Sequence, residues 1–213
     1  MTATSMNSHQ FYLHIEGMDL AGKSSVCRLL GQRASQPLLL RRNALSGDNP
    51  IFDLADRLRR ADAFSSGTLG HLFVAALMAD LERFEWPENP AIQDSTVLLR
   101  SLAFHTVADT PHIPGILEAL LARHPRFDAS FVLTASRATR LERLEARRIE
   151  APEEIAADDL LVVQQPKLFF AMEECLVDLA RRHFGATVID TSSNSVENVV
   201  SVIVEMLPQS ILK

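Results

Sequence analysis

Short apolar runs bounded by turn residues alternate along the chain with longer stretches in which apolar residues recur at helical spacing. The short runs predict β-strands at residues 11–15, 37–40, 91–93, 130–134 and 187–189. The longer stretches predict helices at 23–34, 54–60, 69–84, 98–107, 115–123, 137–148, 158–183 and 195–207. Because strands and helices alternate, we expect a parallel sheet whose strands are joined by crossover helices.

Length and composition bound the class of protein. With 213 residues, 47% of them hydrophobic and 23% charged, the chain is expected to form one globular domain over residues 1–213. Residues 1–10 have neither the basic start nor the apolar core of a signal peptide, and we expect them to be disordered. No stretch reaches the ~20 apolar residues of a membrane span. We therefore expect a cytoplasmic protein with no membrane partner.

Charge and cysteine content narrow the partners further. A formal net charge of -6 and a sequence pI near 5.6 argue against a nucleic-acid partner, since such proteins usually carry an electropositive face. Local positive charge could still hold a small phosphate ligand. Cys27 and Cys175 are far apart and fit neither a disulfide framework nor a metal site, so we expect two buried thiols.

The segment after the first predicted strand has the spacing of a phosphate-binding loop. Four residues separate Gly17 from Gly22, and Lys23 and Ser24 follow at the start of the first predicted helix. Glycines let backbone N–H groups turn inward, and a helix N-terminus favours anions. The pattern predicts Mg-ATP as the ligand, with Lys23 along the β- and γ-phosphates and the Ser24 hydroxyl on Mg²⁺. The alternative is a tight glycine turn with an exposed lysine.

The longer stretch "FYLHIEGMDLAGKSS" resembles the first strand and loop of the thymidylate kinase family. Seven residues carry the resemblance: Glu16, Gly17, Asp19, Ala21, Gly22, Lys23 and Ser24. It implies an α/β fold of the P-loop kinase type, a three-layer sandwich with a parallel five-stranded sheet flanked by helices and a helical lid at about 147–158. It also implies ATP and Mg²⁺ as ligands and a homodimer formed through helices. The residues expected to bind ATP are Gly17, Asp19, Leu20, Ala21, Gly22, Lys23, Ser24 and Ser25, with Leu20 where the family has a second loop glycine.

A second segment, "NPAIQDSTVLLRSLAFHT", resembles the end of the third strand in that family. Asp94 would be its carboxylate, which can belong to the Mg²⁺ shell or help to activate an acceptor hydroxyl. The alternative is that Asp94 caps the helix that follows. Ser95 replaces an arginine of the family, and Arg100, further along the predicted helix, could stand in for it.

The segment "SFVLTASRATRLERLEARR" resembles the fourth strand and the lid of the family. Arg147 and Arg148 lie close to the expected lid, where arginines could clamp the transferring phosphoryl group. Arg140 and Arg143 lie at i and i+3 on the same helical face as Arg147 at i+7, and they could either share this role or simply form a solvated part of the helix. For each of these arginines an exposed, salt-bridged helix face is the alternative.

The acceptor side departs from the family. In "LFVAALMAD", Leu77 and Met78 stand where the family has an Asp-Arg pair that holds the acceptor phosphate, and an apolar pair cannot hold a dianion. The segment "RRNALSGDNP" keeps Arg42 but lacks the family's Glu and Pro-Gly. The residues expected to face the acceptor are therefore Asp19, Arg42, Met78 and Arg100.

These observations favour a divergent kinase that moves the γ-phosphoryl group of Mg-ATP to a nucleoside, a nucleotide or a related small molecule. The expected catalytic residues are Lys23, Asp94, Arg147 and Arg148, and the expected metal ligands are Ser24 and Asp94. One alternative is an ATP-binding regulatory or switch protein that has lost transfer chemistry, and another is a purely structural interaction protein. A GTPase switch is disfavoured, because neither an Asn-Lys-x-Asp segment nor an Asp-x-x-Gly loop is found.

Overall fold

The computed structural model describes residues 10–46, 48–62 and 64–208. Its strands are β1 (Tyr12–Glu16), β2 (Leu39–Arg42), β3 (Ala91–Asp94), β4 (Ala129–Thr134) and β5 (Thr187–Asp190). They form one parallel sheet in the order β2-β3-β1-β4-β5, which confirms the predicted sheet. The sequence predicts disorder at residues 1–10. Of these, residues 1–9 lie outside the described residues.

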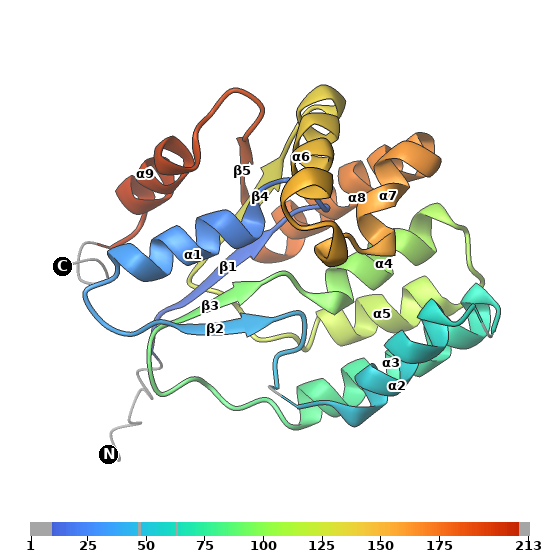
Figure 1. Cartoon of the computed structure of the whole chain (residues 1–213). Helices are drawn as coiled ribbons and strands as arrows, with labels where there is room; N and C mark the ends of the chain where they lie inside the picture. The colour runs from blue at the N-terminus through green and yellow to red at the C-terminus, as the bar shows by residue number, and fades with distance from the viewer. Residues whose placement is uncertain (1–9, 47, 63, 209–213) are drawn as a thin grey trace, which may run out of the picture.

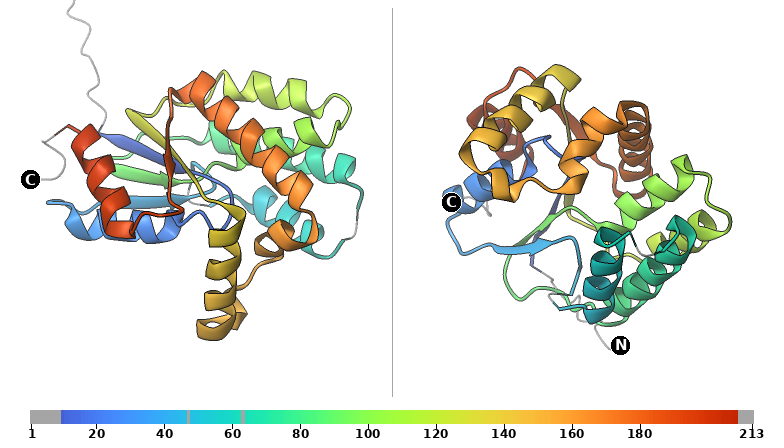
Figure 2. Two further views of the ribbon diagram at one scale, coloured as in Figure 1. Left: turned by 90° about the horizontal axis from the view of Figure 1, so that it is seen from above. Right: turned by 45° about the vertical axis from the view of Figure 1, so that its right-hand side comes forward.

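Helices cover both faces of the sheet, as Figures 1 and 2 show. On one face α1 (Lys23–Arg33) packs beside α9 (Val196–Met206). The other face is covered by α4 (Val97–Val107), α5 (Ile113–Leu121) and α8 (Pro166–Phe184). The pair formed by α2 (Pro50–Arg60) and α3 (Ser66–Glu82) packs against α4 and α5. The expected three-layer α/β sandwich is therefore confirmed.

The region of the expected lid leaves the body of the molecule. The helix α6 (Arg137–Glu150) projects beyond the sheet in Figure 2, and a 3₁₀ turn at Pro152–Glu154 leads from it to α7 (Ala157–Gln164). The stretch from about 147 to 158 thus contains the end of α6, the turn and the start of α7.

The central strand β1 is buried along its whole length, as expected for a strand covered on both faces. Leu13 and Ile15 pack against α1 and α9, whereas His14 and Glu16 point to the opposite face. Glu16, the last residue of β1, is fully buried directly before the glycine loop. The strand therefore delivers a buried carboxylate to the base of that loop.

Several predicted boundaries are corrected. The single helix expected at 158–183 is two helices, α7 and α8, which are separated at Gln165 (φ -138°, ψ 62°). Pro166 causes the break, because proline has no amide hydrogen and disfavours the helical conformation in the residue before it. The helix α2 begins at Pro50 and not at residue 54, because the Asn49 side chain accepts from Phe52 N and caps it.

Two further expectations concern buried groups and membranes. Cys27 is buried as expected, but Cys175 is only partly buried, and both thiols are free. Among the helices of the described residues, none combines the length and the apolar character needed to cross a membrane.

Candidate active site

The glycine loop, residues 17–22, connects the end of β1 to the start of α1. Since β1 lies between β3 and β4, the loop opens at the carboxyl edge of the sheet, where the chain order of the strands changes direction. Ligands of open α/β sheets bind at such an edge. The loop therefore has the position of a ligand-binding site.

Close packing explains the glycines. Gly17 has a φ of +146°, and a Cβ at this position would lie 2.3 Å from the backbone oxygen of Leu133 on β4. Gly22 (φ +93°) also adopts a conformation that side chains disfavour. Leu20 adopts the left-handed region at φ +64° although it carries a side chain. Its side chain is buried with Met18 and Leu144, which offsets the strain of this backbone conformation.

Backbone N–H groups of the loop are available to a ligand. Within residues 17–25, all of which the structure describes, the amides of Leu20, Gly22, Lys23 and Ser24 donate to no protein acceptor. Two of them belong to the first turn of α1, where the helix dipole is positive. Free amides at a helix N-terminus are suited to bind phosphate oxygens.

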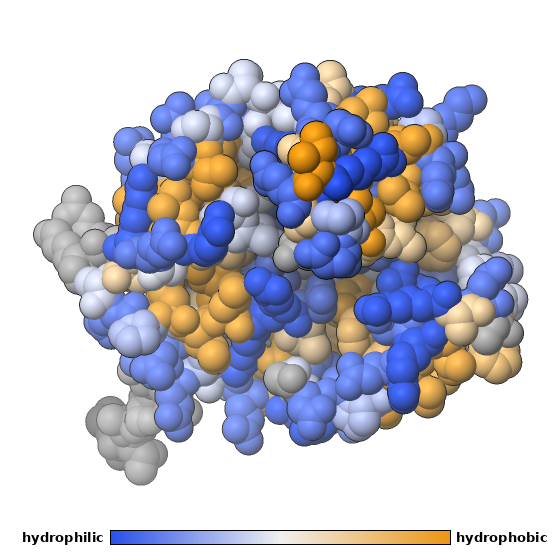
Figure 3. Space-filling view, viewed as in Figure 1, coloured by the Kyte–Doolittle hydropathy of each residue, from blue (hydrophilic) through white to orange (hydrophobic). Residues whose placement is uncertain are grey.

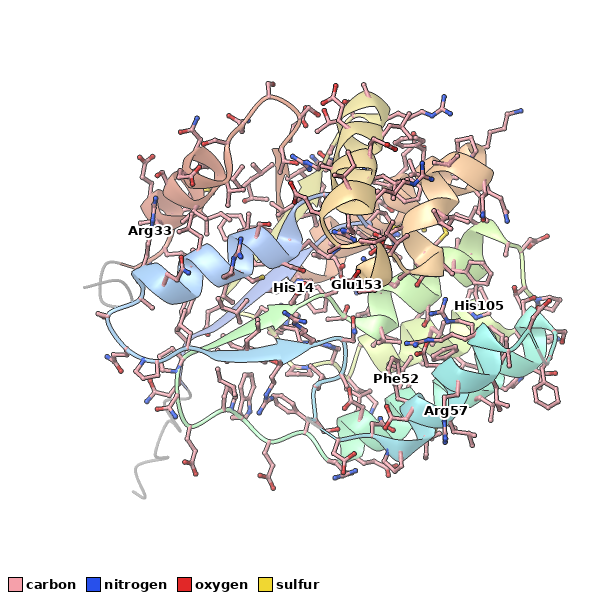
Figure 4. All side chains as sticks on the ribbon, in the orientation of Figure 1. His14, Arg33, Phe52, Arg57, His105 and Glu153 are labelled. Carbon is pink, nitrogen blue, oxygen red and sulfur yellow. The ribbon has the colours of Figure 1, made fainter. Side chains whose placement is uncertain are left out.

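A pocket of about 280 Å³ opens in front of this loop. Figure 4 labels Glu153, which belongs to the 3₁₀ turn between α6 and α7, the two helices that contribute to one wall of the pocket. Its lining residues come from the loop, α1, α6 and the start of α7: Asp19, Leu20, Gly22, Lys23, Ser24, Ser25, Arg147, Ala156, Asp158 and Asp159. Of the residues expected to bind ATP, only Gly17 and Ala21 are outside the lining, and both are buried in the frame of the loop.

The Lys23 ammonium group lies over the loop. Nζ donates to Met18 O at 3.2 Å and is 3.9 Å from Asp19 Oδ1. Burial and the nearby Arg100 lower the pKa of Lys23, while the carboxylates around it act in the opposite direction. The lysine is thus held within the pocket by acceptors that a phosphate oxygen can replace.

Arg100 joins α4 to the loop. Its Nη2 donates to Gly17 O at 2.8 Å and to Asp19 Oδ1 at 3.1 Å, and its Nε lies 3.6 Å from Glu16 Oε1. Burial alone would lower the pKa of Arg100, but Asp19 and Glu16 raise it above its ordinary value. Two of the four residues expected on the acceptor side, Asp19 and Arg100, are therefore brought into direct contact.

Asp94 ends β3 beside the loop. Its side chain is 8% exposed, and its Oδ2 lies 4.0 Å from Arg42 Nε. Burial raises its pKa, against the effect of the Lys23 charge. The interpretation of Asp94 as the cap of α4 is wrong: Thr96 is the N-cap, and its hydroxyl accepts from Leu99 N. The Asp94 carboxylate is thus left free of that role.

A divalent cation would find few protein ligands here. Within the described part of the chain, no group of three or more His, Cys, Asp or Glu side chains could hold a metal ion. The Ser24 hydroxyl in the pocket and the Asp94 carboxylate are hard oxygen donors, which fit Mg²⁺ if phosphate oxygens and water complete its shell.

The two arginines of α6 that are expected to clamp the phosphoryl group have different surroundings. Arg147 lines the pocket, and its Nη1 donates to both oxygens of Asp159 at 2.9 Å. Arg148 pairs with Glu145 on the exposed side of the helix, and the structure does not bring it to the pocket.

The interpretation of Arg140 and Arg143 as a solvated face is wrong. Arg140 is fully buried; it donates to Asp19 O and to Ala135 O, and it pairs with Glu173 of α8. Arg143 donates to Leu20 O at 2.8 Å and to Thr191 O at 2.9 Å. Both arginines therefore brace the loop by binding its carbonyl groups. Arg140, Arg143 and Arg147 are spaced so that they share one face of the helix, and this spacing indicated that all three could act at the same site.

Three of the four expected acceptor residues, Arg100, Met78 and Arg42, do not line the pocket. Arg100 reaches it through its contact with Asp19. Met78 on α3 is 42% exposed and does not line it. The Arg42 side chain is 65% exposed and reaches the site only through Asp94. Nearby, Asp80 of α3 accepts from Leu45 N and Ser46 N, so it holds the chain after β2.

Sequence reasoning missed three charged residues. Asp158 and Asp159 at the start of α7 line the pocket, and Arg59 of α2 donates from Nη1 to Asp158 Oδ1 at 2.8 Å. Figure 3 shows hydrophilic side chains on this face, on both sides of the region between α6 and α2. Nothing in the local sequence could have paired two residues that lie 99 positions apart.

No family model matches the sequence, and no curated protein does so either. Solved structures do match the fold. A thymidylate kinase from Candida albicans superposes with a TM-score of 0.68 at 16% identity, over 95% of this chain and 92% of that one. A deoxyadenosine kinase from M. mycoides gives 0.61 at 17% identity, over 94% and 100%. A thymidylate kinase from Ehrlichia chaffeensis gives 0.60 at 12% identity, over 93% and 98%.

The first strand, the loop and the five-stranded sheet thus agree with the resemblance that the sequence indicated. At these identities the likeness concerns the fold: this chain has the α/β P-loop kinase fold shared by thymidylate and deoxyadenosine kinases.

Proposed function

We propose that the chain is an ATP-dependent phosphotransferase that moves the γ-phosphoryl group of Mg-ATP to a nucleoside, a nucleotide or a related small molecule. The single observation that carries this proposal is the loop, whose residues with free amides line one pocket together with Lys23 and Arg147. The M. mycoides deoxyadenosine kinase has been solved with dCMP and dCDP, and also with dATP. Those complexes support a nucleotide as the ligand of this fold.

Each charged or polar residue of the site has a proposed role in binding the phosphates, the metal ion or the transferring group. The loop amides and Lys23 would bind the β- and γ-phosphates, and Ser24 and Asp94 would hold Mg²⁺. When bound, Mg²⁺ neutralises charge on the phosphate oxygens. Arg147 would leave Asp159 to contact the transferring group, whose charge is spread over its oxygens. Catalysis would then consist mainly of positioning and charge stabilisation.

Asp19 of the phosphate loop and Arg100 of α4 contact each other, and they are proposed to face the acceptor. The stretch around 147–158 carries Arg147 and two aspartates of the pocket, which supports its role as a lid that excludes water during transfer. Arg148, Met78, the homodimer and the cytoplasmic location stay predictions.

Replacing the lysine tests the proposal. In Lys23→Met we expect ATP affinity to fall by about 10- to 100-fold, the loss typical of a charge-assisted hydrogen bond. Titration calorimetry with Mg-ATP measures this loss. Lys167→Met is the matched control, because Lys167 is exposed on α8. Unchanged ATP affinity in Lys23→Met would contradict the proposal.

A second candidate is an ATP-binding regulatory protein without transfer chemistry. The observation that favours it is the pairing of Arg147 with Asp159, which occupies the arginine that lines the pocket. The two candidates differ in ADP production. A kinase produces ADP in proportion to an added acceptor, whereas a switch hydrolyses ATP slowly whichever small molecule is present.

A further inference from the structure

The walls on the acceptor side of the loop carry very few cations. The helix α3 contains no lysine or arginine, and α4 contains Arg100 alone. A phosphate group on the acceptor would need a cation of its own, because the loop amides and Lys23 face the ATP phosphates in the proposed function. Arg100 is the cation placed closest to this role.

Arg100 is already occupied. Asp19 Oδ1 lies 3.1 Å from its Nη2, Glu16 Oε1 lies 3.6 Å from its Nε, and Gly17 O accepts a further hydrogen bond. The pKa values of Asp19 and Glu16 are lowered, although burial opposes this, so both carboxylates are charged at neutral pH. One positive charge therefore faces two negative charges.

Two other arginines of this side pair with carboxylates as well. Arg59 contacts Asp56 and Asp158, and Arg42 lies 4.0 Å from Asp94. Arg41 donates to Glu85 O and lies over two aromatic rings on the far side of β2. Arg57 is exposed on α2, where Figure 4 labels it. Each of the three arginines closest to the loop on this side, Arg100, Arg59 and Arg42, is thus matched by at least one carboxylate.

This balance of charge disfavours an anionic acceptor. A phosphate monoester carries about -1.5 to -2 charges at pH 7, and Asp19, Asp158 and Asp94 would repel it at short range. An uncharged hydroxyl compound meets no such repulsion. Carboxylate oxygens are also good acceptors for its hydroxyl groups.

Apolar side chains lie on the same side. Phe104, one helical turn after Arg100 on α4, packs against the cluster that contains Met18 and Leu20 of the loop. On α3, Leu77 and Phe73 contribute to the cluster formed with α4 and α5. The helices α3 and α4 therefore supply apolar packing beside these carboxylates, and Arg100 is the single lysine or arginine of the two helices.

We propose that the acceptor is an unphosphorylated nucleoside, which is phosphorylated at a sugar hydroxyl, and not a nucleoside monophosphate. This inference rests on the proposed kinase function and specifies its substrate class. In the reaction the hydroxyl oxygen forms a bond to the γ-phosphorus, and the bond from that phosphorus to the β–γ bridging oxygen breaks. ADP leaves with the electron pair, and the hydroxyl proton is released to the solvent.

The proton gives an independent readout. Above the last pKa of the phosphates, transfer to a nucleoside releases one proton per ADP, whereas transfer to a monophosphate releases none, because both products keep the total charge of the reactants. We would therefore measure ADP by a coupled assay and acid release in weak buffer at pH 8. The acceptors are a panel of ribo- and deoxynucleosides and their 5′-monophosphates.

We expect acceptor-dependent ADP with at least one nucleoside, with one proton released per ADP. Its kcat/KM should exceed that of the corresponding monophosphate by about 100-fold or more, as expected for an uncompensated like charge in the site. A monophosphate that is the better acceptor would overturn this inference and leave the kinase function intact. If neither class of acceptor stimulates ADP production, this inference and the assignment of a nucleoside or nucleotide kinase both fail.

Variants test whether the carboxylates cause the preference for a nucleoside over its monophosphate. Asp19→Asn removes one carboxylate partner of Arg100, so the preference for the nucleoside should narrow by about tenfold, which corresponds to about 1.4 kcal/mol of lost repulsion. Asp158→Asn should also reduce the preference for the nucleoside, and it serves as a second test if the Asp19 variant does not fold. Asp178→Asn is the matched control, because Asp178 pairs with Arg182 on an exposed face of α8. An unchanged preference in both site variants would overturn the inference.

Discussion

Arg59 Nη1 lies 2.8 Å from Asp158 Oδ1, so a side chain of α2 contacts the first turn of α7. Arg147 of α6 contacts the next residue, Asp159. The start of α7 is thus held from two sides, by the helix that precedes it in the lid region and by the helix pair on the acceptor side. Both aspartates also line the pocket in front of the glycine loop.

This contact predicts a coupling between α2 and the lid. Arg59→Gln should lower stability by less than about 1 kcal/mol, because the pair is partly exposed. It should nevertheless raise acceptor-independent ATP hydrolysis and the hydrogen exchange of the α7 amides, since the lid loses one of its two anchors. Hydrolysis assays and exchange mass spectrometry measure these effects. Arg60→Gln is the control, as Arg60 pairs with Asp56 and not with Asp158.

The reversed pair Arg59→Asp with Asp158→Arg should restore slow exchange in α7. If the single variant and the control behave alike, the contact has no role in the lid.

Arg147 and Arg148 are neighbours in sequence with different surroundings. We expect Arg147→Gln to lower kcat by about 100-fold or more while ATP affinity stays within a few-fold, because the proposed contact forms only during transfer. Arg148→Gln, which loses a pair with Glu145 on the exposed face, should show a much smaller effect. Steady-state kinetics with the best acceptor decide the matter. Equal losses in both variants would contradict this division.

The packing of Gly17 against β4 makes a prediction about stability. Gly17→Ala should destabilise the protein by roughly 3 kcal/mol, because its Cβ would meet the Leu133 oxygen and its φ is unfavourable for alanine. Gly31→Ala offers the matched control: no atom lies within 4 Å of the added Cβ, and the position is helical. It should gain up to about 1 kcal/mol. Urea unfolding measures the change in the free energy of unfolding of each variant. Similar changes in the two variants would refute this account of the loop.

Glu16 predicts a pH dependence of stability. Burial would raise its pKa, but His14, Arg100 and Lys23 outweigh burial and lower the pKa from 4.5 to about 2. A carboxyl whose pKa is lowered on folding stabilises the fold at pH values above its unfolded pKa. This stabilisation, about 3 kcal/mol by linkage, is lost as the pH falls from about 4.5 to about 2.

Urea unfolding of the wild type and of Glu16→Gln at pH 7 and at pH 3 measures this contribution. The variant should be less stable at pH 7, and the difference should shrink at pH 3. A difference that stays constant between these pH values would show that Glu16 does not cause it.

Much of the fold could be predicted from local patterns. All five strands lie within a few residues of their predicted positions. For the buried strands β1, β3 and β4 the reason is that a buried parallel strand is an apolar run, which can be identified without distant information. The loop could be located because its glycines, lysine and serine form one contiguous segment. Only the break at Gln165 was missed among the larger features, although Pro166 was visible.

The candidate site was predicted less completely. Arg140 was interpreted as solvated, since a helical pattern alone does not show which charged face will be covered, and the structure buries it against Glu173. Thr96 took the capping role considered for Asp94, because the turn at Ser95 (φ +66°) shifts the start of α4 beyond it.

The sequence by itself determined the alternating elements, the glycine loop and the side chains that belong to it, since each depends on residues close together in the chain. Only the tertiary structure decided the partner of each arginine: Glu16 and Asp19 for Arg100, Glu173 for Arg140, Asp158 for Arg59. The physical reason is that an ion pair requires a distance of a few ångströms, and that distance between segments far apart in sequence is set by how the helices pack on the sheet.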